Sequence, residues 1–588
     1  MQATFDNLYK ESRSNNIFRN LYDLIISENN ILLAYRSIKS NSGSKTAGID
    51  NLIIDNLKKL TSYQLICLIR ETLRDYKPKA VKRTFIPKEN GDKRPLGIPS
   101  IIDRLIQQMI KQIIEPIAEA KFYKHSYGFR PLRNTHHAIA RAQTLINKGN
   151  LHYVVDVDIK GFFDNVNHNR LIKQIWNLGI RDKRIISIIS KILKSPIKGE
   201  GIPNKGVPQG GILSPLLANI VLHDLDKWVY SQWEGMKTYY PYKNQGDKIK
   251  RLKTTKLKEG YLVRYADDFK LFARNSQSAY KWFYAIKKYL KERLKLDISI
   301  EKSKVTNLKK KKSDFLGYRL KANLKGNKYV AHTYMKSKKK ISIKQGLKKA
   351  IKQIKDSPIA QNVMKLNSMI MGLHQYFKYM THVSKEFQDI SFSLSKAMYN
   401  GFKHIGRYEH PKSVPNTFKK YYSTTYRTWK IARIYVFPIA DISMQTNLNF
   451  SQTLNVFTEE GRKKIHRNLH KQITLELTKL MYSSNLIQRS TEYIDNKMSR
   501  YSMVKGKCEI TGTFLSTEMI HCHHFLPIKL GGTDKYHNLR ILHKDVHKLI
   551  HATETEIINK YKSFLKLDNE TIKKINIYRK KCNLKVLS

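Results

Sequence analysis

Residues 153–159 read YVVDVDI, and residues 261–272 read YLVRYADDFKLF. The first segment predicts a buried strand with two acids, and the period-2 alternation of a strand places both acids on one face. The second segment predicts a β-hairpin, because two apolar strands flank a tight turn with Asp267 and Asp268 at its tip. We therefore expect a sheet in which the strand acids and the turn acids lie close together.

Carboxylates this close together repel one another unless a cation neutralises them. Side by side, Asp158 and Asp267 would form a cage for two Mg²⁺ ions. One ion would activate an attacking 3′-hydroxyl, and the other would stabilise the leaving pyrophosphate. The pattern therefore favours a two-metal site for nucleotidyl transfer.

The composition indicates a polyanionic partner. The 588 residues include 109 Lys and Arg against 47 Asp and Glu, a formal net charge of +62. This self-repulsion is best tolerated beside a nucleic acid or an anionic membrane surface. Hydrophobic residues make up 41% and aromatic residues 10%, which excludes a disordered basic tail. At roughly 100–200 residues per domain, we expect several folded domains.

Membrane-spanning and secreted proteins are excluded by other features. The longest apolar run, residues 211–222, is too short and too interrupted to cross a bilayer, and the N-terminus lacks a signal pattern. The four cysteines are too scattered for a disulfide framework, so we expect a reducing compartment.

Basic residues concentrate between positions 302 and 355, where 19 Lys and Arg face one acid, Asp314, for a net charge of +18. A charge run can be a solvated helix face. Here aromatic side chains interleave with the lysines, which suits phosphate contact combined with base stacking (Phe315, Tyr318, Tyr329, Tyr334). A second basic stretch, residues 243–258, predicts a surface insertion.

A series of short motifs in this region resembles the reverse transcriptases, and the group II intron-encoded type in particular. In chain order the motifs are AGID (47–50), FIPK (85–88), KRPLGIP (93–99), YGFRP (127–131), DIKGFFD (158–164), GVPQGG (206–211), YADD (265–268) and FLGY (315–318). The resemblance covers residues 45–320 and implies a right-hand polymerase fold.

The resemblance assigns roles residue by residue. Asp158, Asp267 and Asp268 match the catalytic triad, and Ile159 is placed with Asp158 and Asp267 in the site for two Mg²⁺ ions. Asp156 occupies a position that varies in the family, so we leave it outside the triad.

Four further residues match the family's binding site for the incoming dNTP. Phe163 matches the aromatic steric gate that would clash with a ribonucleotide 2′-hydroxyl. Lys88 and Arg94 match basic finger residues that hold the triphosphate, a role suited to fixed cations. Gln209 matches the glutamine that borders the nucleotide pocket.

Downstream residues resemble the helical thumb, or maturase region, of the same proteins, which grips the intron RNA and aids its splicing. Apolar residues recur at helical spacing in this part of the chain (Leu366, Ile370, Leu373, Phe377). The basic segment 441–500 occupies the position of a DNA-binding segment.

Histidines cluster near the C-terminus. Residues 521–524 read HCHH, and His543, His547 and His551 are spaced by four, so on a helix they share one face. Two of these three with His523 would form a three-imidazole metal site with open positions for a phosphate.

Residues 507–552 resemble the ββα-metal fold of HNH nucleases. The resemblance implies that His523, His547 and His551 bind one divalent ion and that His524 is the general base for water. Asn538 would orient that base from the intervening loop.

The module departs from related ones that bind structural zinc through two Cys-x-x-Cys pairs. Tetrahedral zinc needs four ligands, and the corresponding positions keep only Cys508 and His543. We therefore expect no structural zinc, although a remnant site of Cys508 and His543 is left open, and we expect packing around Phe514, Leu526 and Leu530 to replace the zinc.

The predicted fold class is α+β multidomain: a right-hand polymerase with fingers and palm, a helical thumb, and a small ββα-metal nuclease domain. The predicted ranges are an N-terminal helical extension (1–75), fingers and palm (76–325), thumb or maturase domain (326–440), DNA-binding segment (441–500) and HNH domain (501–588). The expected partners are group II intron RNA, target DNA and dNTPs, and no membrane; whether the chain forms a homodimer is left open.

The predicted function is intron mobility through splicing, DNA nicking and target-primed reverse transcription. A splicing-only maturase would lack the catalytic acids, and a reverse transcriptase of another retroelement class would generally lack the HNH module. A basic HNH nuclease with an inert front half conflicts with the ordered motifs. Richness in Lys, Asn and Ile suggests an AT-rich genome, either of a bacterium, with the protein in the cytoplasm, or of an organelle, with it in the matrix or stroma.

Overall fold

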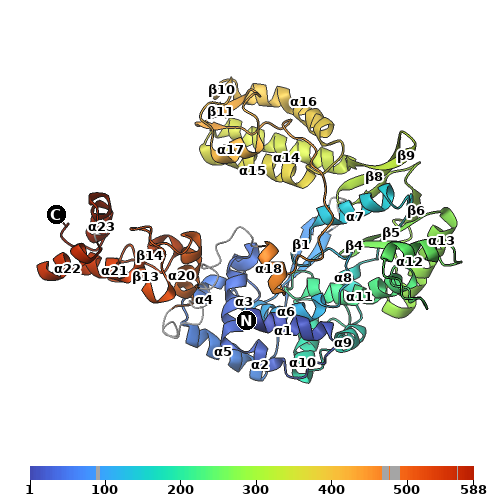
Figure 1. Ribbon diagram of the computed structural model, residues 1–588, viewed down its shortest axis with the longest axis horizontal. Coiled ribbons are helices and arrows are strands. Elements are labelled where there is room, and N and C mark those ends of the chain that lie inside the picture. Colours follow the sequence, from blue (N-terminus) through green and yellow to red (C-terminus); the bar gives the residue numbers. More distant parts are fainter. Residues whose placement is uncertain (88–92, 466–475, 477–489, 566, 588) are drawn as a thin grey trace. The chain divides into compact units, whose positions relative to one another are not determined.

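Residues 1–87, 93–465, 476, 490–565 and 567–587 are described by the computed structural model (Figure 1). Contacts divide the chain into two units that are discontinuous in sequence. Unit 1 contains Met1–Lys121, Ile172–Ser214 and Leu454–Ser588, and unit 2 contains Phe122–Leu171 and Pro215–Thr453. The five continuous domain ranges given above therefore stay a prediction.

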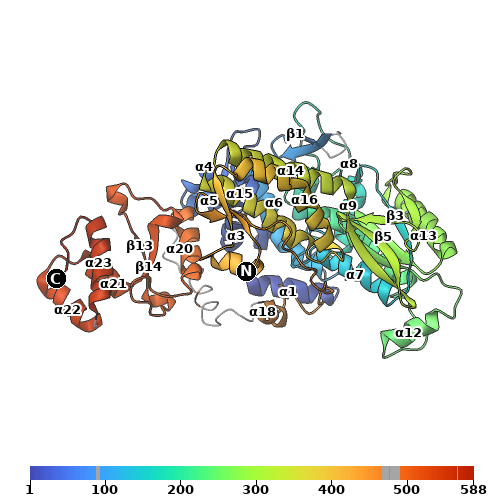
Figure 2. The same cartoon turned by 90° about the horizontal axis from the view of Figure 1, so that it is seen from above.

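An antiparallel sheet carries the acidic segments in unit 2. Its strand order is β4-β5-β3-β6, from β3 (Tyr153–Val157), β4 (Tyr261–Tyr265), β5 (Asp268–Ala273) and β6 (Lys304–Asn307). β4 and β5 pair through a two-residue connection, which confirms the predicted hairpin. Helices α7 (Thr135–Asn147) and α13 (Ser276–Tyr289) pack against this sheet, and Figure 2 shows α13 beside β5.

The apolar residues of these strands are fully buried, which explains why the segments are hydrophobic on both faces. Val154, Val155, Leu271 and Phe272 are each 0% exposed.

A buried ion pair lies within the same sheet. Lys270 of β5 pairs with Asp156 of β3, and Ser313 Oγ accepts a hydrogen bond from Lys270 Nζ at 2.9 Å. Ser313 Oγ also lies 3.0 Å from Asp156 Oδ2, and Thr306 donates to the same carboxylate oxygen at 3.3 Å. Asp156 is thereby committed to a structural network, consistent with its omission from the predicted triad.

The rest of unit 2 comprises helices and two smaller sheets. One sheet has the order β7-β8-β9 and the other β10-β11-β12. The strands are β7 (Ser313–Phe315), β8 (Tyr318–Lys325), β9 (Lys328–Met335), β10 (Gly406–Glu409), β11 (Thr428–Ile431) and β12 (Ile434–Tyr435). The helices are α8 (Phe162–Asn165), α11 (Ser214–Gln232), α12 (Gln245–Leu252), α14 (Ser337–Asp356), α15 (Ala360–Phe377), α16 (Val383–Phe402) and α17 (Asn416–Tyr421).

Helix α15 confirms the helical spacing found downstream of the polymerase motifs. Its residues Leu366, Ile370 and Phe377 are at most 1% exposed, and α14 packs against both α15 and α16. The predicted surface insertion at 243–258 contains the short helix α12.

Unit 1 begins with five helices, which confirms the helical N-terminus. They are α1 (Gln2–Arg13), α2 (Tyr22–Ile25), α3 (Glu28–Lys39), α4 (Ile54–Lys58) and α5 (Ser62–Arg74). The hairpin of β1 (Lys82–Pro87) and β2 (Lys93–Ile98) follows, then α6 (Ile101–Glu119), α9 (His168–Asn177) and α10 (Lys183–Leu193). Helix α6 is the core of this part, because Ile106, Met109 and Ile113 are 0% exposed and α1 and α3 pack against it.

The C-terminal part of unit 1 contains a two-stranded antiparallel sheet followed directly by a helix. Its elements are α18 (Glu459–Ile465), α20 (Thr491–Met503), β13 (Ile520–His524), β14 (Leu539–His543), α21 (Lys544–His551), α22 (Thr555–Leu565) and α23 (Asn569–Lys581). Much of the predicted DNA-binding segment, residues 466–475 and 477–489, lies outside the described residues.

The packing expected for this module is wrong in its details. Phe514, Leu526 and Leu530 are 37–43% exposed, because they lie in loops at the surface. The core is instead made by the two strands, α20, α21 and α23 (Tyr501, Leu515, Leu539, Ile541, Val546, Leu549, Ile575). Within the described residues, no helix is long and apolar enough to span a membrane.

Candidate functional site

The acids of the strand and the hairpin meet at one end of the central sheet. β3 ends at Val157, which pairs with Phe269 of β5, so the same antiparallel register carries Asp158 opposite Asp268. Asp267 lies in the turn between β4 and β5, directly before Asp268. The structure thus brings the three acids onto neighbouring backbone segments, while their catalytic role stays a prediction.

Asp158 is accessible and already faces a cation. Its side chain is 49% exposed, and Lys302 Nζ lies 3.7 Å from its Oδ2. The backbone is fixed on both sides, because the Asp158 N–H donates to Ser303 Oγ at 3.1 Å and Ser299 N–H donates to the Asp158 carbonyl at 2.8 Å. Ile159, which follows, forms a bridge to Ile298.

Asp268 lies in a crowded electrostatic environment. The residue keeps an exposed edge, yet burial of its carboxyl group, together with the nearby Asp156 and Asp267 charges, raises the pKa of Asp268 to about 6. Lys270 and a hydrogen bond from the Leu316 backbone oppose this increase in the pKa. Such like-charge crowding is relieved by a bound cation, and carboxylate oxygens are the ligands that Mg²⁺ prefers.

A buried arginine holds the turn that carries Asp267. Arg264 of β4 forms a bidentate pair with Asp226 of α11, with Nε–Oδ1 at 2.8 Å and Nη2–Oδ2 at 2.6 Å. Arg264 Nη1 also donates to Asn219 Oδ1 at 2.9 Å and to the Ala266 carbonyl at 2.8 Å. The Arg264 and Asp226 side chains are 1% and 0% exposed, so this clamp is isolated from solvent.

The YGFRP motif supports the same turn through its backbone. Tyr127 N–H donates to the Arg264 carbonyl at 2.8 Å, and Arg264 N–H donates to the His125 carbonyl at 3.1 Å. A Cβ at Gly128 would lie 2.3 Å from the Ala266 nitrogen, a distance that no side chain tolerates. Only glycine allows this approach to the turn, in which Ala266 is left-handed with φ +57°.

Phe163 and its neighbour have different environments. Gly161, with φ +52°, starts the short helix α8, in which Phe162 is 3% exposed and belongs to the core. Phe163 remains partly exposed, with its ring centroid 5.3 Å from that of Phe162. Phe163 is therefore available to contact a substrate.

In unit 1 the structure joins the strand of Arg94 to the loop of Gln209. Arg94 is exposed on β2 opposite Ile86, and Gly97 N–H of the same strand donates to the Gln209 carbonyl at 2.6 Å. Lys88 lies outside the described residues.

Four imidazoles gather between β13 and α21. The ring centroids of His523 lie 5.3 Å from those of both His547 and His551, and His547 is 4.7 Å from His551. His521 stacks on His547 at 3.5 Å. The predicted set His523, His547 and His551 is therefore brought together.

The pKa values of three of these histidines favour the uncharged form that binds metals. Burial first, and neighbouring histidines next, lower the pKa of His523 and of His547 to about 3 each. Burial also lowers the pKa of His551. At neutral pH all three are uncharged, which is the form that ligates metals. His523 Nε2 is buried and has no hydrogen-bond partner in the described part of the chain, as expected of an atom reserved for a ligand.

His524 points to a different partner. Its Nε2 lies 2.8 Å from Asp534 Oδ1, and Tyr493 stacks on its ring with centroids 5.5 Å apart. Since a carboxylate accepts, Nε2 carries the hydrogen and Nδ1 keeps the lone pair of a base. Asn538 instead fixes the loop: its Oδ1 accepts from Leu526 N–H at 2.8 Å, and its Nδ2 donates to the Leu526 carbonyl at 3.0 Å.

The chain is similar to several known proteins. The family described as reverse transcriptase (RNA-dependent DNA polymerase) matches residues 86–320. The group II intron-encoded protein LtrA of Lactococcus lactis subsp. cremoris is 33% identical over 370 residues, 55% of this chain and 60% of that protein. Protein YkfC of Escherichia coli is 32% identical over 308 residues, 49% of this chain and 79% of that protein. The chain belongs to the reverse transcriptase family.

The reverse transcriptase segment contains Asp158, Asp267 and Asp268, and its fold mixes helices with antiparallel sheets. The chain spans only 60% of the length of its relative LtrA. A telomerase from Candida albicans, solved with the TWJ fragment of telomeric RNA, is 14% identical. Its TM-score is 0.30 over 56% of this chain and 59% of that one, too low to support an argument.

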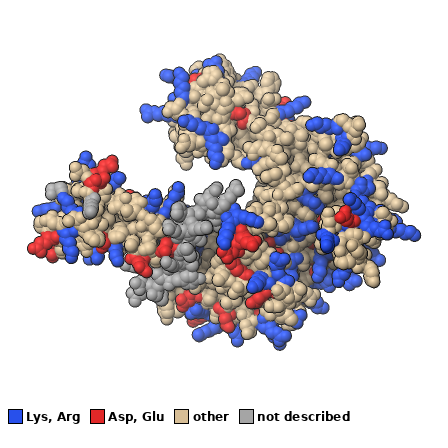
Figure 3. Space-filling model, viewed as in Figure 1, with Lys and Arg blue, Asp and Glu red and all other residues tan. Residues whose placement is uncertain are grey.

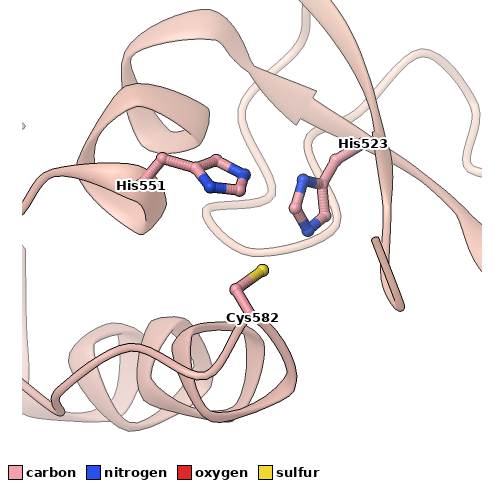
Figure 4. A group of neighbouring side chains, drawn as sticks. All are labelled: His523, His551 and Cys582. Atoms are coloured by element: carbon pink, nitrogen blue, oxygen red, sulfur yellow. The ribbon is translucent and has the colours of Figure 1, made fainter. Parts of the chain in front are cut away.

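Two residues of the histidine module escaped the interpretation of the sequence. Asp534 lies ten residues after His524, in the connection between β13 and β14, and its contact with His524 depends on how this connection folds back. Cys582 follows α23, and its sulfur joins a group with His523 and His551 (Figure 4). It lies 31 residues after His551 in the printed sequence, and no local spacing signals this contact.

The surface of this reverse transcriptase is strongly basic. Figure 3 shows Lys and Arg spread over the visible face of both units, with fewer Asp and Glu. Two lysines of the basic block lie over aromatic rings: Lys309 Nζ is 4.2 Å from the Tyr329 centroid, and Lys312 Nζ is 4.1 Å from that of Tyr334. This pairing of cation and ring is suited to phosphates and bases.

Proposed function

We propose that this reverse transcriptase is a group II intron-encoded protein that combines RNA-directed DNA polymerase, splicing maturase and DNA endonuclease activities. The observation that carries the proposal is the meeting of Asp158, Asp267 and Asp268 at one end of the β4-β5-β3 sheet. The similarity to LtrA supports the intron context.

The polymerase chemistry requires a rigid frame for the acids. Asp158 and Asp267 are proposed to hold two Mg²⁺ ions, which supply activation of the primer 3′-hydroxyl and stabilisation of the leaving pyrophosphate. The buried Arg264–Asp226 clamp keeps the Asp267 turn in place. Asp268 contributes negative charge beside them. Phe163 is proposed to exclude nucleotides that carry a 2′-hydroxyl.

Primer extension on an RNA template tests the polymerase. Asp267→Asn keeps the size of the side chain and removes its charge, so we expect the rate to fall by about 1000-fold or more, equal to ~4 kcal/mol in the barrier. Asp224→Asn, which changes a partly exposed acid paired with Arg170, is the matched control. RNA binding should be equal in both variants. Extension by Asp267→Asn at the wild-type rate would contradict the assignment.

The maturase function rests on the basic and aromatic surface of unit 2. Lys309 and Lys312 lie over the rings of the partly exposed Tyr329 and Tyr334, and the surrounding segment has a net charge of +18. Intron RNA is the proposed ligand, because it offers both phosphates and unstacked bases. Splicing of the encoding intron at low Mg²⁺, with and without the protein, tests this function.

The endonuclease function rests on the sheet-and-helix module of unit 1. His524 Nδ1 is proposed to take a proton from water, while Asp534 holds the ring through Nε2 and stabilises the imidazolium. A divalent ion held by the histidines of this cluster would supply stabilisation of the scissile phosphate and the leaving oxygen. The freed 3′-hydroxyl then becomes the primer for reverse transcription.

Nicking of a duplex that carries the intron insertion site tests the nuclease. His524→Ala should lower the nicking rate by roughly 100- to 10,000-fold, the usual contribution of a general base. His537→Ala, which changes a histidine in the connection between β13 and β14, is the control. Primer extension should persist in both variants, and unchanged nicking by His524→Ala would overturn the assignment.

A further inference from the structure

Three side chains from separate elements converge in the nuclease module. His523 lies in β13, His551 ends α21, and Cys582 follows α23 (Figure 4). One ligand atom from each lies within 4.8 Å of the other two. Zinc binds nitrogen at about 2.0–2.1 Å and sulfur at about 2.3 Å, so ligands of one ion fall within this separation.

The three side chains of this group differ in burial. His523 is 3% exposed, and its Nε2 has no hydrogen-bond partner among the described residues. Cys582 is partly buried, and His551 is exposed. The group therefore has a closed side at His523 and an open side at His551, where a phosphate of the substrate could complete the coordination.

The position of Cys582 is fixed by the helix before it. Arg579 Nη1 donates to the carbonyls of Leu549 at 2.8 Å, Ile550 at 3.0 Å and Ala552 at 2.8 Å, so α23 is held at the end of α21 beside His551. Cys582 N–H in turn donates to the Tyr578 carbonyl at 3.1 Å.

Tyr578 links the same helix to the other ligand. Its ring centroid is 5.7 Å from that of His523. Helix α23 is thus attached both near His551 and near His523, and a metal ligand on it needs no rearrangement of the backbone.

We propose that the Sγ of Cys582, with imidazole nitrogens of His523 and His551, binds one divalent cation of the zinc class. The thiol proton passes to solvent as the metal–sulfur bond forms, and the site keeps an open position. His547, which the resemblance placed in the metal set, stacks on His521, and the group whose ligand atoms lie within 4.8 Å of one another is made by His523, His551 and Cys582. A thiolate ligand selects Zn²⁺ or Co²⁺ over Mg²⁺ and Mn²⁺.

This inference deepens the proposed nuclease and rests on it only for what the ion does. Metal binding itself is measurable without any nuclease assay. If Cys582 merely fills space at the end of a helix, its replacement by serine will leave metal affinity and spectra unchanged.

Titration of the full-length, chelator-treated chain with Co²⁺ alone tests the ligand set. We expect one equivalent to bind with a near-ultraviolet thiolate-to-cobalt charge-transfer band. Cys582→Ser should remove the band and weaken Zn²⁺ binding by at least about tenfold. Cys67→Ser, which changes an exposed cysteine of α5, should keep both. His523→Ala should lose tight binding.

A band that persists in Cys582→Ser, or a wild-type chain without the band, would overturn the inference. Circular dichroism and thermal melting of the apo variants ensure that a lost band does not arise from misfolding. A wild-type chain that shows the band but never nicks DNA would refute the nuclease and support the cysteine ligand. A wild-type chain that nicks DNA but shows no thiolate-to-cobalt band would support the nuclease and refute the cysteine ligand.

Discussion

At the residue scale, the two adjacent phenylalanines of α8 have different roles: Phe162 packs in the core, and Phe163 is the proposed steric gate for the substrate sugar. We expect Phe163→Ala to admit ribonucleotides, because removing the ring opens space for a 2′-hydroxyl, and to lower dNTP over rNTP discrimination by roughly tenfold or more. Single-nucleotide incorporation with dNTP and rNTP measures this ratio. Phe162→Leu is the matched control: this core residue is 3% exposed, so its change should affect stability without altering sugar selection.

His374 gives the helical region of unit 2 a pH dependence. It is 5% exposed in α15, its Nε2–H donates to the Ile439 carbonyl at 3.0 Å, and burial lowers its pKa from 6.5 to about 4. Between pH 6.5 and pH 4, His374 is protonated in the unfolded chain and remains neutral in the folded chain. Stability is therefore complete above pH 6.5 and falls by about 3 kcal/mol as the pH approaches 4.

The variant His374→Gln replaces the imidazole N–H donor with an amide N–H donor, and its side chain does not titrate. We expect its local stability to vary less with pH than that of the wild type, by about the same 3 kcal/mol between pH 7 and pH 4. Amide hydrogen exchange of α15, followed by mass spectrometry, measures this difference. Parallel pH profiles for the two proteins would show that His374 is not responsible.

At the element scale, the Arg264–Asp226 pair connects α11 to the hairpin that carries Asp267. Arg264→Met should destabilise the chain by about 3–5 kcal/mol, because it leaves the Asp226 carboxylate buried without its partner. Urea unfolding measures the loss. The double variant Arg264→Met/Asp226→Leu should recover most of the stability, since an apolar pair of similar volume replaces the ions.

Polymerase activity should not recover in that double variant. Arg264 Nη1 donates to the Ala266 carbonyl and so restrains the turn, whereas methionine has no such donor. A double variant with wild-type primer extension would show that the turn needs no such restraint.

At the scale of the whole molecule, the charge of +62 predicts a steep salt dependence of RNA binding. Each phosphate contact contributes roughly 0.7 to the slope of log K against log salt for a single strand. Lys309→Gln/Lys312→Gln should therefore reduce the slope by about 1.4. Filter binding across a KCl series measures it. Lys77→Gln, which changes a lysine paired with Asp75, is the control and should have a smaller effect.

The sequence allowed the hairpin, the buried strand, the N-terminal helices and α15 to be predicted, because each depends on local periodicity and turn residues. The spacing of the histidines also allowed the grouping of His523, His547 and His551 to be predicted. The partners of Asp156, His524 and Cys582 were not accessible in this way. Lys270 meets Asp156, and Asp534 meets His524, through tertiary packing. Cys582 meets His523 and His551 in the same way, and short-range spacing carries no information about such contacts.

The sequence does not indicate the division of contacts into two discontinuous units, because that division also depends on tertiary packing. Predicted ranges followed the order of the motifs, whereas unit 1 gathers three separated stretches of the chain. The outward position of Phe514, Leu526 and Leu530 shows a further limit: apolar residues in loops carry no periodicity from which to judge burial.

Gly128 imposes a restriction on how this protein can vary. The nearest backbone atom to a Cβ at this position belongs to Ala266, in a motif far along the chain. A saturating mutational scan should therefore find position 128 intolerant of every side chain, including alanine, although no reacting group lies there. Gly43 and Gly372 have nothing within 4 Å of an added Cβ, and they should accept substitution. Glycines of one molecule would then differ in constraint: the close approach of two backbone segments requires Gly128, whereas no neighbouring atom requires Gly43 or Gly372.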